Sequence, residues 1–432
     1  MSSSPALTAP ALTAPVRANL FTAAVIFGLF VLAAIVSAER KDVRGFDEVA
    51  HASYVASIQQ TGNAWPTLDS LRMLDPQTFK FTDKANYLDH PPIFYALLAA
   101  LGPDLEGHPH ALLAHRLIDV MLAALGLAAL LGLGLAAGFS RYEFCAFAVP
   151  LACIPILPLL AGAINNDDLA FLGGALATLG VWQLAATNRG GWLALALAGV
   201  VVAAWAKLTG FLLTGAMVSA VIAYLIWRRR WRWSWTIAVA LAFLIAAASY
   251  AVFLVQYGSP APDTPAQISM IENNARVVGV ADLPRKSFPF YLGYFALVFI
   301  VDWMPIGSRD IFNYAMLIIP VAALICALAG LALSLRRLWH REETVLDVVV
   351  IAGALSLFVT LVLHVHHAYA DHLATGWLEE AYPRYYLPLA AIVPLAGLSL
   401  LAAIESPRWR NALLGFLIAG PIAFHLLGTP LG

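Results

Sequence analysis

Asp47 and Glu48 form an acidic pair shortly after the first long apolar run of the chain. At the spacing of an α-helix, Asp47, His51 and Tyr54 share one face, and Glu48 lies about 100° around the helix. A carboxylate in such a group can take a proton from a hydroxyl as a general base. Asp is also a favoured N-cap residue, so a capping role for Asp47 stays open.

Two further polar stretches contain acidic groups beside apolar segments. Asp89 and His90 precede Pro91 and Pro92, which stop a helix. The two prolines predict either a rigid turn that presents Asp89 and His90 or a simple helix break at a membrane interface. Four polar residues form a short loop between two apolar runs, where they would serve chemistry or cap a hairpin. They are Asn165, Asn166, Asp167 and Asp168.

Two basic residues stand out because their surroundings are apolar or aromatic. Lys207 interrupts an apolar run over 191–227, either as a functional cation or as a lysine marking a tight turn. Arg384 is flanked by tyrosines, including Tyr385, which are also typical of an interfacial belt. A guanidinium matches phosphate geometry, so Arg384 is a candidate anion-binding residue.

A histidine-rich stretch, "LHVHHAYADH", contains His366, His367 and Asp371. Histidine and aspartate can bind a divalent metal, but this spacing matches no standard site. The alternative is a set of water-facing residues at the end of a membrane span. We therefore assign no required cofactor and keep a divalent metal as an open alternative.

Composition places these residues in a membrane protein with many spans. The 432 residues are 61% hydrophobic and 12% charged, whereas soluble domains carry about 25% charged residues. The net charge of −1 argues against nucleic acid as a partner. The three cysteines lie in apolar segments and predict neither disulfides nor a metal pair.

We predict an all-α bundle of about eleven transmembrane helices. After a disordered cytoplasmic tail over 1–18, residues 19–432 form one transmembrane domain. The predicted spans are 19–38, 114–138, 144–163, 167–187, 191–206, 208–227, 234–256, 312–335, 345–366, 384–403 and 411–428.

Charge asymmetry predicts the orientation of these spans. Basic connections such as "RRRWR" and "RRLWHR" would face the cytoplasm by the positive-inside rule. The N-terminus would then be cytoplasmic, and loops 39–113, 257–311 and 367–383 extracytoplasmic, with the first loop helical. Residues 288–306 are apolar, but a span there would reverse the later loops. We therefore expect that segment to be interfacial or re-entrant.

The motifs resemble those of GT-C glycosyltransferases, which use polyprenyl-phosphate sugars. "FDEVAHASYVASIQQTG" resembles the acidic motif of the first external loop, and "DHPPIFY" the His-Pro-Pro element of protein O-mannosyltransferases and lipid A aminoarabinose transferases. "NNDDLA", "AKLTG" and "PRYYLP" are similar to later acidic, lysine and arginine elements. The resemblance covers most of the chain in order and spacing, and implies the GT-C fold.

The resemblance implies sugar transfer with inversion at the extracytoplasmic face of a plasma (bacterial inner) membrane. The donor would be a polyprenyl-phosphate-linked sugar, and the acceptor a hydroxyl of a lipid, glycan or protein. Asp47 would be the base, supported by Glu48, while Arg384, Lys207 and His90 would bind the donor phosphate. Supporting residues would be His51, Tyr54, Asp89, Asn166, Asp167, Asp168 and Tyr385.

Two other classes stay open. Charged residues inside spans and the broken apolar segment over 288–306 also fit a transporter or lipid flippase. Such a protein should carry charged residues deep in its spans, and Asp119 is the clear candidate. Asp119 lies one helical turn from Arg116, with which it would form a local pair. The second class is a lipid-linked glycan ligase or polymerase.

Overall fold

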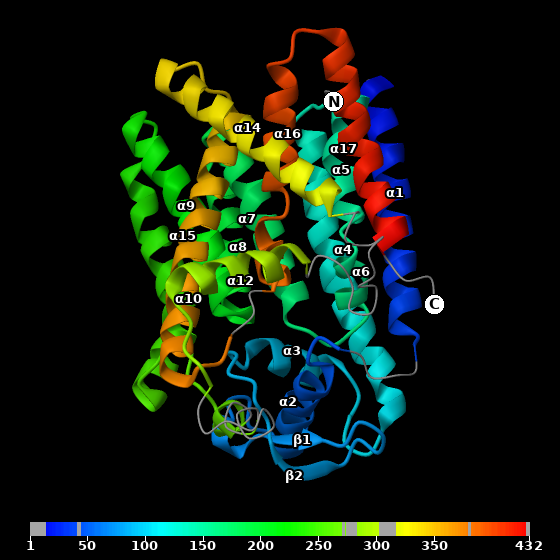
Figure 1. The fold of residues 1–432 in the computed structure, drawn as a ribbon, viewed down its shortest axis with the longest axis vertical. Helices are drawn as coiled ribbons and strands as arrows, with labels where there is room; N and C mark the ends of the chain where they lie inside the picture. The colour runs from blue at the N-terminus through cyan, green and yellow to red at the C-terminus, as the bar shows by residue number, and fades with distance from the viewer. Residues whose placement is uncertain are drawn as a thin grey trace, which may run out of the picture.

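A computed structural model describes residues 14–40, 45–269, 273, 283–301, 317–378 and 382–428. Long helices run side by side along the longest axis, and a small unit of helices and a hairpin covers one end (Figure 1). The long helices are α1 (Ala14–Ala38), α4 (Leu112–Ala136), α7 (Asp167–Thr187), α8 (Gly190–Ala206), α9 (Leu208–Trp227), α10 (Thr236–Tyr257), α14 (Ile318–His340), α15 (Val345–Thr375) and α17 (Pro407–Gly428).

The described residues contain eight helices that are long and apolar enough to cross a membrane. A ninth span would be the bent pair formed by the 3-10 helix η4 (Pro383–Leu389) and α16 (Ile392–Ala402), which meet at 60°. These counts fall below the predicted eleven. Helix α8, with 17 residues, is slightly too short, and the expected span over 144–163 is broken.

Prolines explain that break. Helix α5 (Arg141–Ala152) ends before Pro155, and α6 (Ile156–Ala161) begins after it. A proline lacks the N–H that a continuous helix needs and clashes with the preceding turn. Helix α1 begins at Ala14, so residues 14–18 of the predicted tail are helical. Residues 1–13 of the predicted tail lie outside the described residues.

The apolar segment expected to be interfacial or re-entrant is helical over α12 (Phe288–Val301). This helix runs across the bundle instead of along its long axis (Figure 1). It packs against α15 through Tyr291 and Phe295, which are buried with Val365. Its direction agrees with an interfacial position, and residues 302–306 of the predicted segment lie outside the described part of the chain.

The first predicted loop folds into a compact unit beneath the bundle. It comprises α2 (Glu48–Thr61), η1 (Leu68–Ser70), β1 (Arg72–Leu74), β2 (Phe81–Ala85), α3 (Ile93–Leu101) and η2 (Pro109–Ala111). The two strands are antiparallel, with Arg72 opposite Ala85. Tyr54, Phe94 and Leu98 are fully buried in the core of this unit, so it holds α2 firmly against the bundle.

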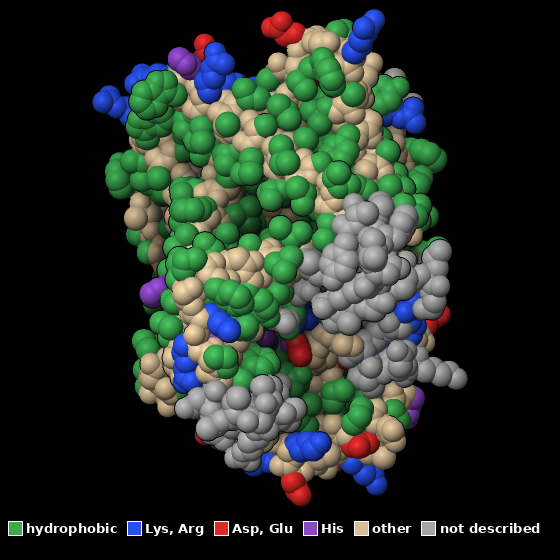
Figure 2. Space-filling view, viewed as in Figure 1, with side chains coloured by type: hydrophobic (Ala, Val, Ile, Leu, Met, Phe, Trp, Pro, Cys, Tyr) green, Lys and Arg blue, Asp and Glu red, His purple; other side chains and the backbone are tan. Residues whose placement is uncertain are grey.

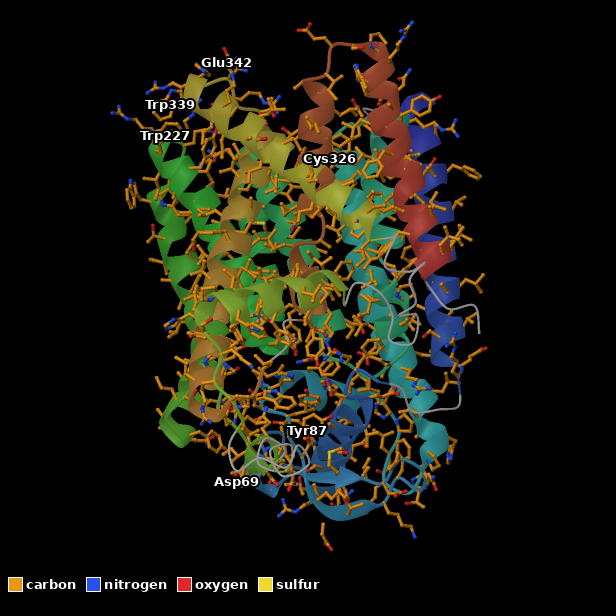
Figure 3. The ribbon with its side chains drawn as sticks, in the orientation of Figure 1. Asp69, Tyr87, Trp227, Cys326, Trp339 and Glu342 are labelled. Carbon is orange, nitrogen blue, oxygen red and sulfur yellow. The ribbon has the colours of Figure 1, made fainter. Side chains whose placement is uncertain are left out.

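Polar and apolar surfaces separate along the bundle. Trp227, Trp339 and Glu342 lie at one end, and Asp69 and Tyr87 lie near the other (Figure 3). On the face shown in Figure 2, charged side chains gather at the upper end and over the lower third, with a largely apolar band between them. This arrangement is expected of a protein whose middle contacts lipid.

Glycines allow the helices to approach closely near the first-loop unit. A Cβ added to Gly174 of α7 would overlap the backbone of Pro388 in η4. Gly173 and Gly199 bring α7 and α8 together in the same way. Small residues are a usual means of close helix packing in membranes. Here the packing sets η4, which carries Arg384, directly on α7, which begins at Asp167.

Candidate functional site

Asp47 lies at the junction between the first-loop unit and the bundle. It occupies the N-cap position of α2, but its side chain makes no capping hydrogen bond. One carboxylate oxygen accepts from the Tyr87 hydroxyl at 2.9 Å, and the other accepts from the Arg384 guanidinium at 2.9 Å. Because the side chain is 38% exposed, a molecule in the adjacent space can reach it.

Glu48 has a different role from the one its sequence position suggested. Its side chain is fully buried and forms a two-point ion pair with Arg116, at 2.7 Å for each contact. It also accepts from the backbone N–H of Ile164 at 3.1 Å. Glu48 therefore joins α2 to α4 and does not face the same space as Asp47. Arg116, which the sequence placed one turn from Asp119, thus pairs with a residue 68 positions away.

Lys207 lies in an extended break between α8 and α9, with φ −165° and ψ 159°. It is only 4% exposed, so it is not a solvent-facing lysine at a turn. Its ammonium group pairs with the carboxylate of Asp167 and lies 4.1 Å from the centre of the Tyr385 ring. The extended break thus turns a basic residue inward, where Asp167, the first residue of α7, supplies its counter-charge.

Arg384 connects the two carboxylates. Besides its bond to Asp47, its Nε lies 3.6 Å from Oδ2 of Asp167. The guanidinium also faces the rings of Tyr382, at 4.9 Å, and Tyr385, at 5.5 Å. Asp47, Arg384, Asp167 and Lys207 therefore form a chain of alternating charges, assembled from α2, η4, α7 and the α8–α9 break.

Asn165 determines which ring nitrogen of His51 carries the proton. Its Oδ1 accepts from the Asp167 N–H at 2.8 Å and its Nδ2 donates to the Phe46 carbonyl at 2.8 Å, which sets the orientation of the amide. The same Nδ2 lies 3.4 Å from Nε2 of His51. Nε2 is consequently an acceptor, and Nδ1–H donates to the Tyr95 hydroxyl at 2.9 Å. Burial lowers the pKa of His51, so this imidazole is neutral at pH 7.

Asp89 and His90 form the opposite wall, at the rigid turn that the two prolines predict. Their side chains lie 3.4 Å apart and are each about a quarter exposed. Loss of hydration raises the pKa of Asp89 from 3.8 to about 6. Loss of hydration and the nearby Lys207 lower the pKa of His90 well below its usual value. His90 is therefore neutral at pH 7, a hydrogen-bonding group and not a cation.

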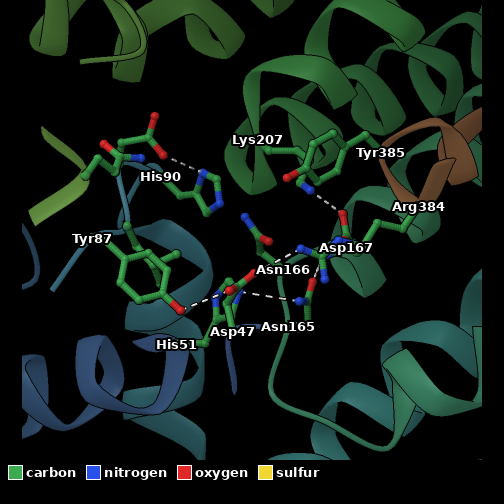
Figure 4. Close-up of a pocket in the computed structure, with 13 residues that line it drawn as sticks. Asp47, His51, Tyr87, His90, Asn165, Asn166, Asp167, Lys207, Arg384 and Tyr385 are labelled. Carbon is green, nitrogen blue, oxygen red and sulfur yellow. Dashed lines mark hydrogen bonds and ion pairs between the residues drawn. The ribbon is translucent and has the colours of Figure 1, made fainter. Parts of the chain in front are cut away.

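These side chains line one cavity of about 130 Å³ (Figure 4). Of the predicted site residues, it brings together Asp47, His51, Asp89, His90, Asn166, Asp167, Lys207, Arg384 and Tyr385. Asn166 is held in place by a 2.8 Å bond to the carbonyl of Ala206. Residues from five separate parts of the sequence thus meet at the junction between the first-loop unit and the bundle.

Several predicted residues lie behind the cavity wall or elsewhere. Tyr54 is buried and stacks on Tyr95, with ring centres 4.0 Å apart, so it supports the wall. Asp168 is fully buried and is not among the residues that line the cavity. His367 pairs with Asp371 at 3.4 Å on an exposed surface. Among the described residues, no group of three or more His, Cys, Asp or Glu side chains has a metal-binding arrangement. This holds for the stretch that contains His366 as well.

The cavity also contains residues that the sequence did not single out. The Tyr87 hydroxyl donates to Asp47. Tyr87 lies two positions before Asp89, but the sequence contains no feature that selects it. Asn165 lay in a selected loop without an assigned role of its own. Gln267 lines the cavity from a helical segment over 265–269, and no local pattern marked it. Side chains that reach a site across the fold leave no periodic signal.

The fold and the cavity define a multi-pass membrane protein with a charged site at one end of its bundle. Among solved structures, ArnT from Cupriavidus metallidurans in the apo state matches with a TM-score of 0.51 and 14% identity, over 92% of this chain and 62% of that one. The same protein bound to undecaprenyl phosphate matches with a TM-score of 0.48 and 16% identity, over 92% and 63%.

This likeness confirms the predicted fold class, because ArnT has the GT-C fold. The chain spans about 62% of the length of that structure. No protein-family model matches the sequence. No curated protein matches it either. The chain therefore shares the polytopic helical GT-C fold of ArnT, which is the fold that the motif resemblance implied.

Proposed function

We propose that this protein is an inverting glycosyltransferase that moves a sugar from a polyprenyl phosphate to an acceptor hydroxyl at the extracytoplasmic membrane face. The observation that carries the proposal is the convergence of Asp47, Arg384 and Lys207 on one cavity. A reaction of this type needs a base for the hydroxyl and fixed cations for the departing phosphate. The cavity contains both.

Asp47 suits the role of the base. It is a partly exposed carboxylate, and its position is fixed from two sides by Tyr87 and Arg384. When the acceptor hydroxyl attacks the anomeric carbon, its proton passes to Asp47 as the carbon–phosphate oxygen bond breaks. Glu48 takes no part in this step, because Arg116 and the backbone of Ile164 occupy both of its oxygens.

Arg384 and Lys207 suit the leaving phosphate. Both are nearly buried, so the electrostatic attraction for an anion is screened less than it would be at the surface. Charge-assisted bonds from a guanidinium can contact two phosphate oxygens at once. Neutral His90 adds a further polar contact. Asp167 keeps both cations in place while the cavity has no anionic substrate.

The arrangement favours an enzyme over a transporter. The alternating charges gather at one end of the bundle, beside the first-loop unit, and not along a path through it. Asp119 lies deeper in α4, yet it accepts from the backbone N–H of Asn165 at 3.3 Å and so helps to hold the loop that lines the cavity.

The test is loss of sugar from defined donors. Purified protein in lipid nanodiscs would be incubated with undecaprenyl-phosphate-linked neutral, amino and acidic sugars, and release of undecaprenyl phosphate measured with and without acceptor extracts. We expect turnover of one donor class.

Binding of undecaprenyl phosphate itself should weaken by about 10- to 150-fold in Arg384→Ala, which corresponds to the loss of one charge-assisted bond. Arg410→Ala, at the other end of the bundle, is the matched control. Failure of every donor together with unchanged affinity in Arg384→Ala would reject the proposal.

A further inference from the structure

The turn that presents Asp47 has a costly backbone conformation. Phe46 and Asp47 both adopt left-handed conformations, with φ of 64° and 62°. Bulky residues such as Phe rarely do so, and the conformation persists only where the surroundings hold it. Asp47 makes no side-chain capping bond that would offset this cost. Another part of the fold must therefore hold the turn.

Asn165 makes the contact that holds it. Its amide donates to the carbonyl of Phe46 at 2.8 Å, across 119 positions of sequence. Asn165 is 1% exposed, and its Oδ1 is fixed by the N–H of Asp167. The amide cannot rotate without losing one of these bonds. The segment that supplies the counter-charge of Lys207 thus also sets the backbone that carries Asp47.

We propose that Asn165 is a positioning residue for Asp47. It holds the left-handed Phe46–Asp47 turn so that the carboxylate faces the cavity between Tyr87 and Arg384, and it keeps Nε2 of His51 as an acceptor beside it. The kinetic part of this inference rests on the proposed glycosyl transfer, whereas the conformational part does not.

A thermal unfolding cycle tests the conformational part. Phe46→Ala and Phe46→Gly both remove the ring, but only glycine adopts a positive φ freely. Asn165→Leu, of similar size and without hydrogen bonds, would be added to each background. We expect the loss of Tm caused by Asn165→Leu to be about twofold larger with glycine at position 46 than with alanine, because alanine can leave its strained conformation once the contact is lost. Equal losses in the two backgrounds would overturn the inference.

Kinetics with the undecaprenyl-phosphate sugar that is turned over test the positioning part. Asn165→Leu should lower kcat by about 10-fold or more and change KM by less than about twofold, because the cations are untouched. Adding Phe46→Gly should restore much of kcat, and adding Phe46→Ala should not. Asn188→Gly, at the opposite end of α7, is the control and should leave turnover unchanged.

The outcomes separate this inference from the proposed function. A Tm coupling between positions 46 and 165, in a wild-type protein that turns over no donor, would support the conformational part and count against glycosyl transfer. The positioning role of Asn165 would be overturned, even in an active transferase, if Asn165→Leu lowered turnover by raising KM instead of lowering kcat. Equal rescue of kcat by Phe46→Ala and Phe46→Gly would overturn it as well.

Discussion

Asp47 and Glu48 are adjacent in sequence, yet they have opposite environments. Asp47 is over a third exposed and lines the cavity, whereas Glu48 is fully buried against Arg116. One step along a helix rotates a side chain by about 100°, which is enough to separate solvent from core. The pair therefore offers a direct comparison between a chemical role and a structural one.

Asp47→Asn tests the chemical role. The amide keeps the size of the side chain but cannot take up the hydroxyl proton, so we expect turnover to fall by about 10²- to 10⁴-fold. Binding of undecaprenyl phosphate and the Tm should stay near the wild-type values. Donor turnover measured beside both properties checks this. Wild-type turnover in the Asn variant would remove Asp47 from the reaction.

Asp89 predicts a pH dependence of stability. Loss of hydration raises its pKa from 3.8 to about 6 in the folded protein, so the ionised form is disfavoured there. The carboxyl group consequently destabilises the fold above about pH 6, and this effect disappears as the pH falls toward 3.8. Asp89→Asn should raise the Tm at pH 8 and have little effect near pH 4. Asp83→Asn, on exposed β2, is the control, and a Tm difference that is independent of pH would contradict the assignment.

At the scale of elements, the ion pair between Glu48 and Arg116 connects three helices. Arg116 of α4 also donates to the carbonyl of Ala38, at the end of α1, at 3.1 Å. The pair therefore sets where α2 enters the junction, although it does not line the cavity. Breaking it would remove two charge-assisted bonds inside the protein.

Glu48→Gln tests this structural role. Removing one partner of a buried ion pair costs about 3–5 kcal/mol, so we expect a clear loss of Tm. Turnover per folded molecule should remain within about tenfold of wild type, because Asp47 and the cations are retained. Unfolding and turnover would be measured on the same preparation. An unchanged Tm with abolished turnover would instead place Glu48 in the reaction.

The contact between α7 and η4 carries a second element-scale prediction. Gly174→Ala places a methyl group against the backbone of Pro388 and should displace Arg384 from Asp47 and Asp167. We expect weaker binding of undecaprenyl phosphate and lower turnover. Gly132→Ala in α4, where a Cβ meets nothing within 4 Å, is the matched control and should be tolerated. Wild-type binding in Gly174→Ala would show that η4 does not depend on this close approach.

At the scale of the whole molecule, the orientation in the membrane is the open prediction. The basic turns and the first-loop unit lie at opposite ends of the bundle (Figure 3). We expect the first-loop unit and its cavity to be extracytoplasmic. With Cys145, Cys153 and Cys326 replaced by alanine, a membrane-impermeant maleimide should label Lys84→Cys in intact cells. Ser406→Cys should react only after permeabilisation. The reverse pattern would place the cavity in the cytoplasm and contradict the proposed function.

The sequence determined the class of the fold and most candidate site residues. Long apolar runs predict membrane helices because a bilayer fixes their length. Charged residues beside such runs are rare, so each of them is a candidate site residue. Asp47, Asp167, Lys207 and Arg384 belong to this group. The described residues contain fewer spans than the sequence predicts, partly because Pro155 breaks one apolar run that composition alone reads as continuous.

Only the tertiary structure decided which of these residues meet. Asp47 and Glu48 are adjacent carboxylates, and only the structure shows that Glu48 is buried against Arg116 while Asp47 lines the cavity. Only the structure brings Gln267 to the cavity, and only the structure shows that Tyr87, near Asp89 in sequence, contacts Asp47. Local sequence sets helix periodicity and hydrophobic length. Contacts such as that between Asn165 and Phe46 depend on packing across 119 positions, which no local pattern records.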